Sequence, residues 1–428
     1  MQYSEAIDYL YSRLPVFHRI GAKALKPGLG NTERLCAALG NPERQFRSIH
    51  VGGTNGKGSS SHMLAAIYQQ AGYRVGLYTS PHLQSFTERI RINGVPIAET
   101  AVAEFVTQQQ ALIESIEPSF FELTVAMAFD YFARSSVDLA IIEVGLGGRL
   151  DSTNVIQPEL ALITNIGLDH TDILGDTLPL IAAEKAGIIK AGRPVVIGET
   201  HPETEPVFRA KAGAAGAPLV VADQAYTVQD GGLLNGQRQV SVSKAGAAAM
   251  NLTLDLLGGY QLRNLPGVLA AVELLQPTWP VPPAAIVSGL GQVARLTGLR
   301  GRFQTLQTSP RVIADTAHNL PGLRALAETL DSLTYAQLHL VLGMVADKER
   351  QAVLAILPVS ARYYFCQAQT PRSLPAGQLA LEAARFGLLG EGFSDVNQAL
   401  AAARQAAAPD DLIVVTGSNY TIAELTDL

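Results

Sequence analysis

The stretch Ser48-Ile-His-Val-Gly-Gly-Thr-Asn-Gly-Lys-Gly-Ser-Ser60, followed by a helical pattern up to Gly72, decides how the rest of the chain is interpreted. Its glycines allow the backbone to curl with N–H groups pointing inward, which residues with a β-carbon do less easily. A lysine and a hydroxyl follow, and the next helix points the positive end of its dipole at the loop. The stretch therefore predicts a phosphate-binding loop between a strand and a helix.

Within this loop, Lys57 is expected to reach the β- and γ-phosphates of a nucleotide, and Ser59 to place its hydroxyl on a magnesium ion. The common phosphate-loop pattern has Ser or Thr directly after the lysine, whereas Gly58 intervenes here. The alternative is a glycine-rich turn that binds nothing. The order of strand, loop, lysine, hydroxyl and helix favours a nucleotide-binding enzyme.

Composition limits the class of protein. Hydrophobic residues make up 47% of the 428 residues and charged residues 16%, which excludes disorder and suits an α/β protein of two or three domains. The net charge of −6 without a dense basic run argues against nucleic acid as a partner. Cys36 and Cys366 are expected to be buried and reduced. We find no signal-peptide pattern and no apolar run long enough to span a bilayer, which predicts a cytoplasmic protein without membrane contact.

Periodicity predicts two blocks of alternating strands and helices. Strands are expected at 73–79, 139–144, 160–165 and 195–198, then at 311–315, 337–343, 361–366 and 411–416. Short alternating runs within 199–260 suggest an antiparallel appendage, and 297–303 is typical of a linker. We therefore predict an α/β fold of two domains. Residues 1–296 form a mostly parallel sheet of the phosphate-loop ATPase type with helices and the appendage, and residues 304–428 form a smaller Rossmann-like domain.

Polar residues follow three strands of the first block, where open α/β sheets bind ligands. Ser80 follows the strand at 73–79, Glu143 ends the next, and His170 follows the strand at 160–165. A carboxylate downstream of a phosphate loop has the position of a magnesium ligand. The alternatives are a Ser-Pro turn and an ordinary loop histidine. A dinucleotide-binding interpretation of the glycines from Gly145 onward is disfavoured, because the third glycine of that pattern is missing.

A lysine lies within an apolar helical stripe further along. Leu178, Ile181, Ala182, Lys185 and Ile189 fall on one face. The alternative is a lysine whose stem packs while its ammonium reaches water. Burial would instead lower the pKa of its amine, and a neutral amine can add carbon dioxide.

Strand ends of the second block also carry polar residues. They are Asp315-Thr-Ala-His-Asn319, Asp347-Lys348 and Thr416-Gly-Ser-Asn-Tyr420. A cleft between the two sheets is the natural place for an active site.

Taken together, these motifs resemble the bifunctional folylpolyglutamate synthase and dihydrofolate synthase family, within the Mur ligases. The segments that carry the resemblance are Gly53-Thr-Asn-Gly-Lys-Gly-Ser59, Thr79-Ser-Pro-His-Leu83, Glu143-Val-Gly-Leu-Gly-Gly-Arg-Leu-Asp-Ser-Thr-Asn154, Asn165-Ile-Gly-Leu-Asp-His170, Glu184-Lys185, Gly301-Arg302 and Thr416-Gly-Ser418. The resemblance covers nearly the whole chain and accounts for the extra Gly58.

The resemblance implies roles for individual residues. It implies ATP contacts at Thr54, Asn55, Gly56, Lys57, Gly58, Ser59, Asn264, Arg302 and Asp315. It implies magnesium ligands at Ser80, Glu143 and His170 beside Ser59, for two ions, and carbamylation of Lys185. It also suggests a catalytic role for His318, but the family has Asp-Gly-Ala-His-Asn-Pro where this chain has Thr316 and Leu320, so that role is left open.

Two further segments are similar to those that touch the pterin in this family. They are Ser119-Phe-Phe-Glu122 and Leu150-Asp-Ser152. Phe120 or Phe121 would stack on the flat pterin, and Glu122 or Asp151 would accept its ring N–H groups. The alternative is that both aromatic residues belong to the core of a helix, because the segment after them is strongly apolar.

The expected reaction is amide formation. ATP phosphorylates a substrate carboxylate, and the amine of L-glutamate attacks the acyl phosphate, so that no nucleophilic side chain is needed. The expected partners are dihydropteroate, reduced folates and L-glutamate, bound by a monomer. The alternatives are a folylpolyglutamate synthase without the dihydropteroate activity, another Mur-type amino-acid ligase, and a nucleotide-dependent switch. Only about 50 residues precede the loop, too few for the UDP-sugar domain of a cell-wall Mur ligase.

Overall fold

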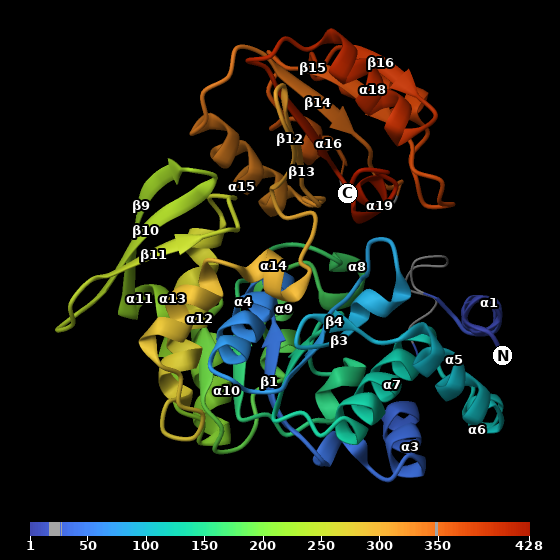
Figure 1. The fold of residues 1–428 in the computed structure, drawn as a ribbon, viewed down its shortest axis with the longest axis vertical. Coiled ribbons are helices and arrows are strands. Elements are labelled where there is room, and N and C mark those ends of the chain that lie inside the picture. Colours follow the sequence, from blue (N-terminus) through green and yellow to red (C-terminus); the bar gives the residue numbers. More distant parts are fainter. Residues whose placement is uncertain (17–25, 27, 347–349) are drawn as a thin grey trace. The chain divides into compact units, whose positions relative to one another are not determined.

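The computed structural model describes residues 1–16, 26, 28–346 and 350–428, and residue contacts divide the chain into two units (Figure 1). The N-terminal unit comprises Met1–Asp255 and Leu262–Gly298. The C-terminal unit comprises Leu299–Leu428 and also Leu256–Gln261, a short segment that lies between two parts of the first unit in the chain. Asp347-Lys348, singled out in the sequence, falls outside the described residues.

A mostly parallel sheet forms the centre of the N-terminal unit. In the part of the chain described, its order is β4-β3-β2-β5-β1-β6-β7-β8. The strands are β1 (Arg47–Gly52), β2 (Val75–Tyr78), β3 (Ile90–Ile92), β4 (Val95–Pro96), β5 (Leu139–Glu143), β6 (Leu160–Ile163), β7 (Val195–Ile197) and β8 (Leu219–Val221). Strand β1 lies between β5 and β6 and is parallel to both, while β3 and β4 form an antiparallel hairpin. The carboxyl ends of β5, β1 and β6 therefore share one edge of the sheet.

Helices cover this sheet. They are α1 (Tyr3–Arg13), α3 (Gly30–Ala38), α4 (Lys57–Gln70), α5 (Glu99–Gln108), α6 (Gln110–Ile116), α7 (Phe120–Arg134), α8 (Thr171–Leu174), α9 (Leu178–Ala186), α10 (Glu205–Ala215), α11 (Ala222–Ala225), α12 (Gln261–Leu275), α13 (Pro283–Leu290) and α14 (Val293–Thr297). Short 3-10 turns occur at η2 (Pro42–Arg44), η3 (Phe86–Arg89) and η4 (Ser152–Val155). Helix α7, which the sequence predicted to be apolar nearly all round, is buried along most of its length, including Val125, Met127 and Phe129. Helices α5 and α6 follow each other directly, with Gln109 between them.

The antiparallel appendage is smaller than the sequence suggested. Strands β9 (Tyr226–Leu234), β10 (Gln237–Lys244) and β11 (Met250–Leu254) form a three-stranded antiparallel sheet. The prediction for 199–260 was wrong before residue 226, because 205–215 is helix α10 and β8 pairs in parallel with β7. Alanine-rich and glycine-rich composition concealed one more βαβ unit there.

The C-terminal unit is a second α/β sheet, with described strands in the order β12-β13-β17-β14-β15-β16. They are β12 (Gln304–Thr308), β13 (Arg311–Ala314), β14 (Leu338–Leu342), β15 (Arg362–Cys366), β16 (Gly390–Phe393) and β17 (Leu412–Thr416); the helices are α15 (Leu320–Asp331), α16 (Arg350–Leu354), α17 (Ala376–Ala384), α18 (Val396–Ala406) and α19 (Asn419–Ala423). The two-domain α/β class predicted from sequence is confirmed. Among the described helices, none combines the length and apolar character needed to cross a bilayer.

Candidate active site

The loop after β1 is a glycine-dependent cradle at the start of helix α4. Gly53 has φ +141° and Gly56, which caps the helix, has φ +81°. A β-carbon at Gly53 would lie 1.9 Å from the hydroxyl oxygen of Thr164, and one at Gly56 would lie 2.1 Å from Oδ1 of Asn264. Both positions therefore require glycine for conformation and for space. The second approach also places Asn264, a predicted ATP contact on α12, directly against the loop.

Residues at the end of β6 hold this cradle in place. The backbone N–H of Thr54 donates to the carbonyl of Asn165 at 2.9 Å, and that of Asn55 donates to the Asn165 side chain at 2.9 Å. The hydroxyl of Thr164 donates to the carbonyl of Asn55 at 2.6 Å. The Thr54 hydroxyl donates to the carbonyl of Gly167 and accepts from its N–H, at 3.1 and 3.0 Å. The loop is thus preformed by contacts to one neighbouring strand end.

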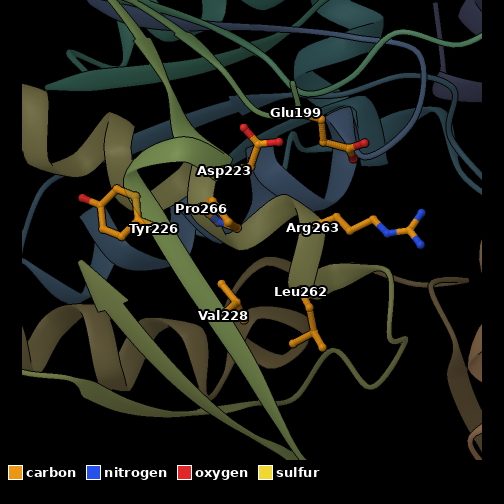
Figure 2. A pocket seen from close by; sticks show the side chains of 7 residues that line it. All are labelled: Glu199, Asp223, Tyr226, Val228, Leu262, Arg263 and Pro266. Carbon is orange, nitrogen blue, oxygen red and sulfur yellow. The ribbon is translucent and has the colours of Figure 1, made fainter. Parts of the chain in front are cut away.

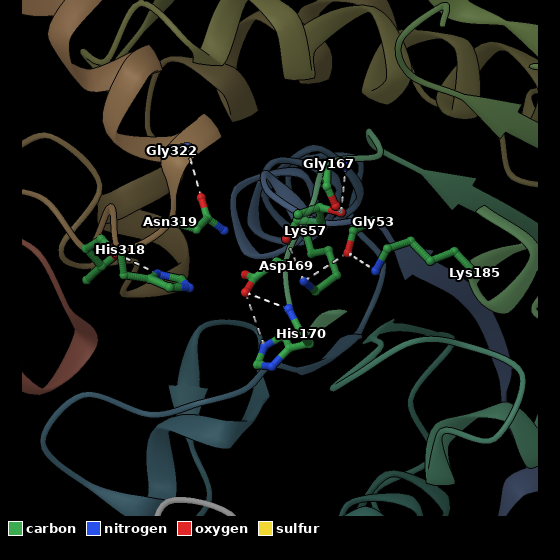
Figure 3. Close-up of polar contacts among 11 residues, drawn as sticks. Gly53, Lys57, Gly167, Asp169, His170, Lys185, His318, Asn319 and Gly322 are labelled. Atoms are coloured by element: carbon green, nitrogen blue, oxygen red, sulfur yellow. Dashed lines mark hydrogen bonds and ion pairs between the residues drawn. The ribbon is translucent and has the colours of Figure 1, made fainter. Parts of the chain in front are cut away.

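Two lysines point at the same carbonyl oxygen, as Figure 3 shows. Lys57 Nζ donates to the carbonyls of Gly53 and Thr54, both at 3.1 Å. Lys185 Nζ donates to the Gly53 carbonyl at 2.8 Å from helix α9. The two lysine side chains therefore converge on the cradle from different helices, and Lys57 is in position to act on an anion held there.

Lys185 is almost fully buried, with 4% of its surface exposed. Burial, and secondly the positive charge of Lys57, lowers the pKa of Lys185 to about 7. The sequence alternative, a lysine that reaches water, does not describe this side chain. Near neutral pH a large fraction of its amines is uncharged, which is the reactive form toward electrophiles.

The predicted metal ligands lie at the same edge of the sheet. Glu143, at the end of β5, is 4% exposed, and its Oε2 accepts the backbone N–H of Ser80 at 3.1 Å. Ser59 is buried in the first turn of α4. His170 is partly exposed at the N-terminus of α8 with φ +52°, and its backbone N–H donates to the Asp169 carboxylate at 2.9 Å. The contacts join Ser80 to Glu143, and His170 to its neighbour Asp169.

This donor set fits a hard divalent cation. In the described part of the chain, no three His, Cys, Asp or Glu residues gather into a metal site by themselves. Mg²⁺ commonly takes one or two carboxylates, and completes its shell with water and substrate phosphates instead of a full protein cage. The Glu143 carboxylate and the hydroxyls of Ser59 and Ser80, beside a phosphate cradle, are oxygen donors of that kind, and His170 adds a nitrogen donor.

The predicted pterin segment at 119–122 contains a helix cap. The Ser119 side chain accepts the N–H of Glu122 at 3.2 Å, and the Glu122 carboxylate accepts the N–H of Ser119 at 2.6 Å. The amide of Asn31 donates to the same carboxylate at 3.3 Å. This reciprocal pair begins helix α7 and satisfies two backbone donors. Ser119 and Glu122 thus have a structural role, and Glu122 is only 4% exposed.

The two phenylalanines of that segment differ. Phe120 is 3% exposed, with its ring stacked on Tyr11 at 5.1 Å between centroids and the Arg89 guanidinium 5.3 Å from its centroid. Phe121 is partly exposed and abuts Gly145, where a β-carbon would lie 2.4 Å from its ring. Phe120 therefore belongs to the core, as the alternative from sequence has it. Phe121 retains accessible surface next to Gly145, in the loop that follows Glu143.

The second predicted substrate segment follows the same loop. Asp151 is 6% exposed and accepts the N–H groups of Leu146 and Thr153, at 2.8 and 3.0 Å. Burial raises the pKa of its carboxyl, against the effect of these hydrogen bonds. Ser152 is also buried, whereas Leu150 is 48% exposed. Asp151 closes the loop, and Leu150 presents an apolar surface to the outside.

The C-terminal unit assembles its own polar group. Asp315, directly after β13, is 2% exposed; its carboxylate accepts the Tyr260 hydroxyl at 2.6 Å and the Phe303 N–H at 2.8 Å. Arg302 donates to the Thr316 hydroxyl, and that hydroxyl donates to the Gly301 carbonyl at 3.1 Å. Thr316, which departs from the family pattern, thus takes part in holding Arg302.

His318 and the turn after it also belong to this group. The Nδ1 atom of His318 lies 3.0 Å from the Thr316 carbonyl, so Nδ1 is the donor (Figure 3). Asn319 caps α15 by accepting the Gly322 N–H at 2.9 Å. Leu320 begins the helix and Pro321 follows, so the departure at 320 moves the proline by one position within the first turn. Proline is well tolerated there.

A pocket of about 280 Å³ lies at the ends of β7 and β8 and the first turn of α12. Its lining residues are Glu199, Asp223, Tyr226, Val228, Leu262, Arg263 and Pro266 (Figure 2). Glu199 and Arg263 extend to the same side of the view, and burial raises the pKa of the Glu199 carboxyl. The Asn165 amide donates to Glu199 at 3.4 Å, so one asparagine contacts both the pocket and the cradle.

Sequence reasoning missed several residues of these groups. Thr164 was recognised only as part of a strand, and Asn165 only as a strand end that opens one of the segments of the resemblance. Tyr260 and Glu199 were not singled out. The position of Asn165 at the carboxyl end of the strand beside β1 was a usable signal. Nothing in the local pattern of Tyr260 indicates a partner 55 residues away.

Comparison with known proteins adds independent findings. Residues 51–272 match the Mur ligase middle domain and residues 301–419 the Mur ligase, glutamate ligase domain. The chain is 34% identical to the dihydrofolate synthase/folylpolyglutamate synthase of Bacillus subtilis, covering 99% of this chain and 98% of that one. It is 35% identical to a probable bifunctional folylpolyglutamate synthase/dihydropteroate synthase of Haloferax volcanii, over 99% of this chain but only 50% of that one, so it spans about half of that relative.

Solved structures agree with these matches. The Escherichia coli FolC complex with DHPP and ADP has a TM-score of 0.84 at 33% identity, over 99% of this chain and 96% of that one. A bifunctional folylpolyglutamate synthase/dihydrofolate synthase with Mn, AMPPNP and L-glutamate bound has a TM-score of 0.84 at 32% identity, over 99% and 97% of the two chains.

Proposed function

This chain belongs to the folylpolyglutamate synthase and dihydrofolate synthase family of Mur ligases, which are ATP-dependent ligases, and we propose that it joins L-glutamate both to dihydropteroate and to glutamylated reduced folates. The observation that carries the proposal is the preformed cradle, in which Lys57 and Lys185 converge on the Gly53 carbonyl beside Glu143. The names of the relatives, and the ligands in their structures, support the choice of substrates.

The chain's own residues supply binding and charge. A nucleotide phosphate in the cradle would replace the Gly53 and Thr54 carbonyls as the partner of Lys57, whose ammonium then opposes the charge that develops during phosphoryl transfer. The substrate carboxylate oxygen attacks the γ-phosphorus and ADP leaves. The neutral amine of glutamate then attacks the acyl carbon and loses a proton as the amide bond forms. The bond between the acyl carbon and the bridging oxygen breaks, and inorganic phosphate leaves with that oxygen.

We propose that Ser59, Ser80, Glu143 and His170 hold divalent metal, Mg²⁺ or Mn²⁺, as two ions. Metal bound there would neutralise phosphate charge. The Glu143 carboxylate is already oriented by the Ser80 N–H, so it needs little rearrangement to serve as a ligand.

We also propose that Lys185 is carbamylated. Its pKa of about 7 leaves neutral amine at physiological pH. The neutral nitrogen forms a bond to the carbon of CO₂ and releases one proton, which turns the uncharged amine into a carbamate anion. The product would stand next to the cradle, because Lys185 already contacts the Gly53 carbonyl.

For the substrates, we propose that Phe121 and Leu150 supply the contact surface for the pterin, while Ser119, Glu122, Asp151 and Ser152 shape the loops that carry them. Phe121 and Leu150 are the members of the two segments with accessible apolar surface. Phe120 supports them from the core. Arg302, Asp315 and His318, with Asn264 from the N-terminal unit, are proposed to complete the ATP site and the ligation step.

We further propose a cytoplasmic monomer that acts on small molecules and binds no nucleic acid or membrane, with domains at 1–296 and 304–428 joined by 297–303. The net charge of −6 supports the absence of nucleic acid.

The deciding experiment is ADP release by the purified protein with dihydropteroate or with a reduced folylglutamate, each with and without L-glutamate. Both carboxylates should give glutamate-dependent ADP release. Turnover with the folate alone, and no inhibition by dihydropteroate, would indicate a folylpolyglutamate synthase only. ADP release that depends on neither carboxylate would indicate a nucleotide-dependent switch instead.

A further inference from the structure

The N-terminal unit ends at Gly298, directly after helix α14, and the chain then runs into the segment that carries Arg302. The last residues before this exit are fixed by neighbours from three elements of the N-terminal unit. These neighbours are His62 of helix α4, Arg91 of strand β3 and Gly94 of the β3–β4 turn. None of the three was singled out by the sequence, and none takes part in the chemistry proposed above.

The central contact is a buried hydrogen bond between His62 and Thr297. His62 Nδ1 lies 2.7 Å from the Thr297 hydroxyl, and the two residues are 4% and 0% exposed. The same hydroxyl donates its one proton to the Val293 carbonyl at 2.6 Å. It must therefore accept from His62, which assigns the proton to Nδ1. Loss of either partner leaves a buried polar group without this bond.

The hairpin β3–β4 holds the same exit from another side. A β-carbon at Gly94 would lie 1.8 Å from the carbonyl oxygen of Leu296, so the turn approaches α14 backbone to backbone. Arg91, 5% exposed, donates to the Gly298 carbonyl at 3.4 Å and also to the Glu88 carbonyl. The residue that leaves the unit is thus contacted by a buried guanidinium.

Helix α4 connects this exit to the cradle. It begins at Lys57, and His62 follows on the next turn, about 7.5 Å further along the axis. Helix α13 packs on the same helix so closely that a β-carbon at Gly289 would lie 2.8 Å from Cα of Ile67. One rigid helix therefore carries the phosphate-binding lysine at its start and the anchor of the chain exit in its second turn.

We propose that His62 is a positioning residue, which fixes the origin of the linker relative to the phosphate cradle and thereby places Arg302 for turnover. The inference rests on the proposed function, because Arg302 matters only if it acts in the ligase reaction. His62 acts through Thr297 and touches no substrate. This role differs from simple packing, because the hydrogen bond of His62 holds Thr297, the last residue of the helix that precedes the linker.

The test compares variants that remove the hydrogen bond with variants that retain it. Thr297→Val and His62→Leu remove it, whereas Thr297→Ser keeps the hydroxyl and His62→Asn keeps a donor near the position of Nδ1. Ser288→Ala is the matched control, because it removes a 2.8 Å hydrogen bond to Gln70 of the same helix, away from the exit. The measurements are kcat, KM for glutamate, thermal midpoint, and the rate of tryptic cleavage after Arg300 or Arg302.

In Thr297→Val and His62→Leu, kcat should fall at least about tenfold, because a small misplacement of Arg302 loses transition-state stabilisation. Linker cleavage should accelerate about tenfold, the factor expected when one buried hydrogen bond no longer opposes local opening. Thr297→Ser, His62→Asn and Ser288→Ala should stay within about twofold of wild type. The double variant should be no worse than either single one, since both remove the same bond.

The inference is overturned if Thr297→Val keeps wild-type kcat and cleavage, or if Ser288→Ala loses as much activity for the same change in thermal midpoint. Failure of the proposed function looks different. In that case the wild-type protein releases no ADP with either carboxylate, while the cleavage measurement still reports on the anchor.

Discussion

The cradle at 53–59 and the segment at 119–122 are both motif-rich starts of helices, yet their side chains are used differently. In the cradle, the lysines of two helices converge on one carbonyl, and the loop is held from outside by Asn165 and Thr164. In the second segment, Ser119 and Glu122 hold each other, and Phe120 packs into the core. A motif residue can therefore mark a site by touching the ligand, or by building the element that presents its neighbour.

The largest effect should come from the cradle. Lys57→Ala is expected to lower ligation about a thousandfold or more with both carboxylates, because it removes a preorganised charge from the phosphoryl group. The half-buried side chain contributes little packing, so the thermal midpoint should hardly move. Steady-state ADP release and a thermal melt measure the two quantities. Appreciable turnover in the folded variant would place phosphate binding elsewhere.

The second lysine of the cradle, Lys185, should affect how the free energy of unfolding depends on pH. The pKa of Lys185 lies near 7 in the folded protein against 10.5 ordinarily, so burial of the ammonium costs stability fully below about pH 7. That cost disappears as the pH rises toward 10.5, where the unfolded chain also loses its proton. Lys185→Met should therefore be more stable than wild type by an amount on the order of a few kcal/mol at about pH 6, and this advantage should shrink at higher pH.

Denaturant unfolding in CO₂-free buffer at several pH values is the measurement. A difference between wild type and Lys185→Met that does not change with pH would mean that Lys185 is solvated in both states.

In the segment at 119–122, substitutions of the two aromatic residues should have different effects, one on KM and the other on stability. Phe121→Ala is expected to raise KM for dihydropteroate about tenfold through lost stacking and burial, with little change in stability. Phe120→Leu is the matched control, since its ring is enclosed by Tyr11 and Arg89; it should lower the thermal midpoint and leave KM unchanged. If Phe120→Leu raised KM for dihydropteroate and Phe121→Ala did not, the buried ring of Phe120 would be the pterin contact instead.

The smallest effect is expected at the cap. Glu122→Ala should lower the free energy of unfolding by about 1 kcal/mol, because it removes half of the reciprocal cap, and Glu122→Gln should restore it. KM for dihydropteroate should change less than twofold in both variants. A raised KM in both, without a change in stability, would show that the carboxylate contacts substrate after all.

Much of this architecture followed from local patterns. The apolar strands β5, β14 and β17 are buried along their whole length, which is what a continuous apolar run predicts. Strands β12 and β16 were missed because edge strands need no such run: β12 reads Gln-Thr-Leu-Gln-Thr and β16 Gly-Glu-Gly-Phe. Strand β8 was missed inside a segment whose composition resembled that of a loop.

The site could be predicted only as far as strand ends and spacing determine it. Lys185 was found because an apolar stripe contained a charge, and its burial bears out that logic. Asn165 and Tyr260 act through partners that are distant in sequence, and a single sequence carries no trace of such pairs. The cap formed by Ser119 and Glu122 corresponds to a local pattern, Ser-x-x-Glu before an apolar run, whereas the pterin contact of the same residues is implied only by the resemblance.

Positions 56 and 264 cannot vary independently. Any side chain at 56 would meet the amide of Asn264, because even a β-carbon would come within 2.1 Å of its Oδ1. A larger residue at 56 would thus demand a smaller one at 264, which would in turn remove the amide that lies against the loop. We expect each single change to disturb the cradle, so the pair should not be exchangeable by one mutation at a time. Laboratory evolution of altered nucleotide preference would have to leave both positions fixed and seek its changes around them.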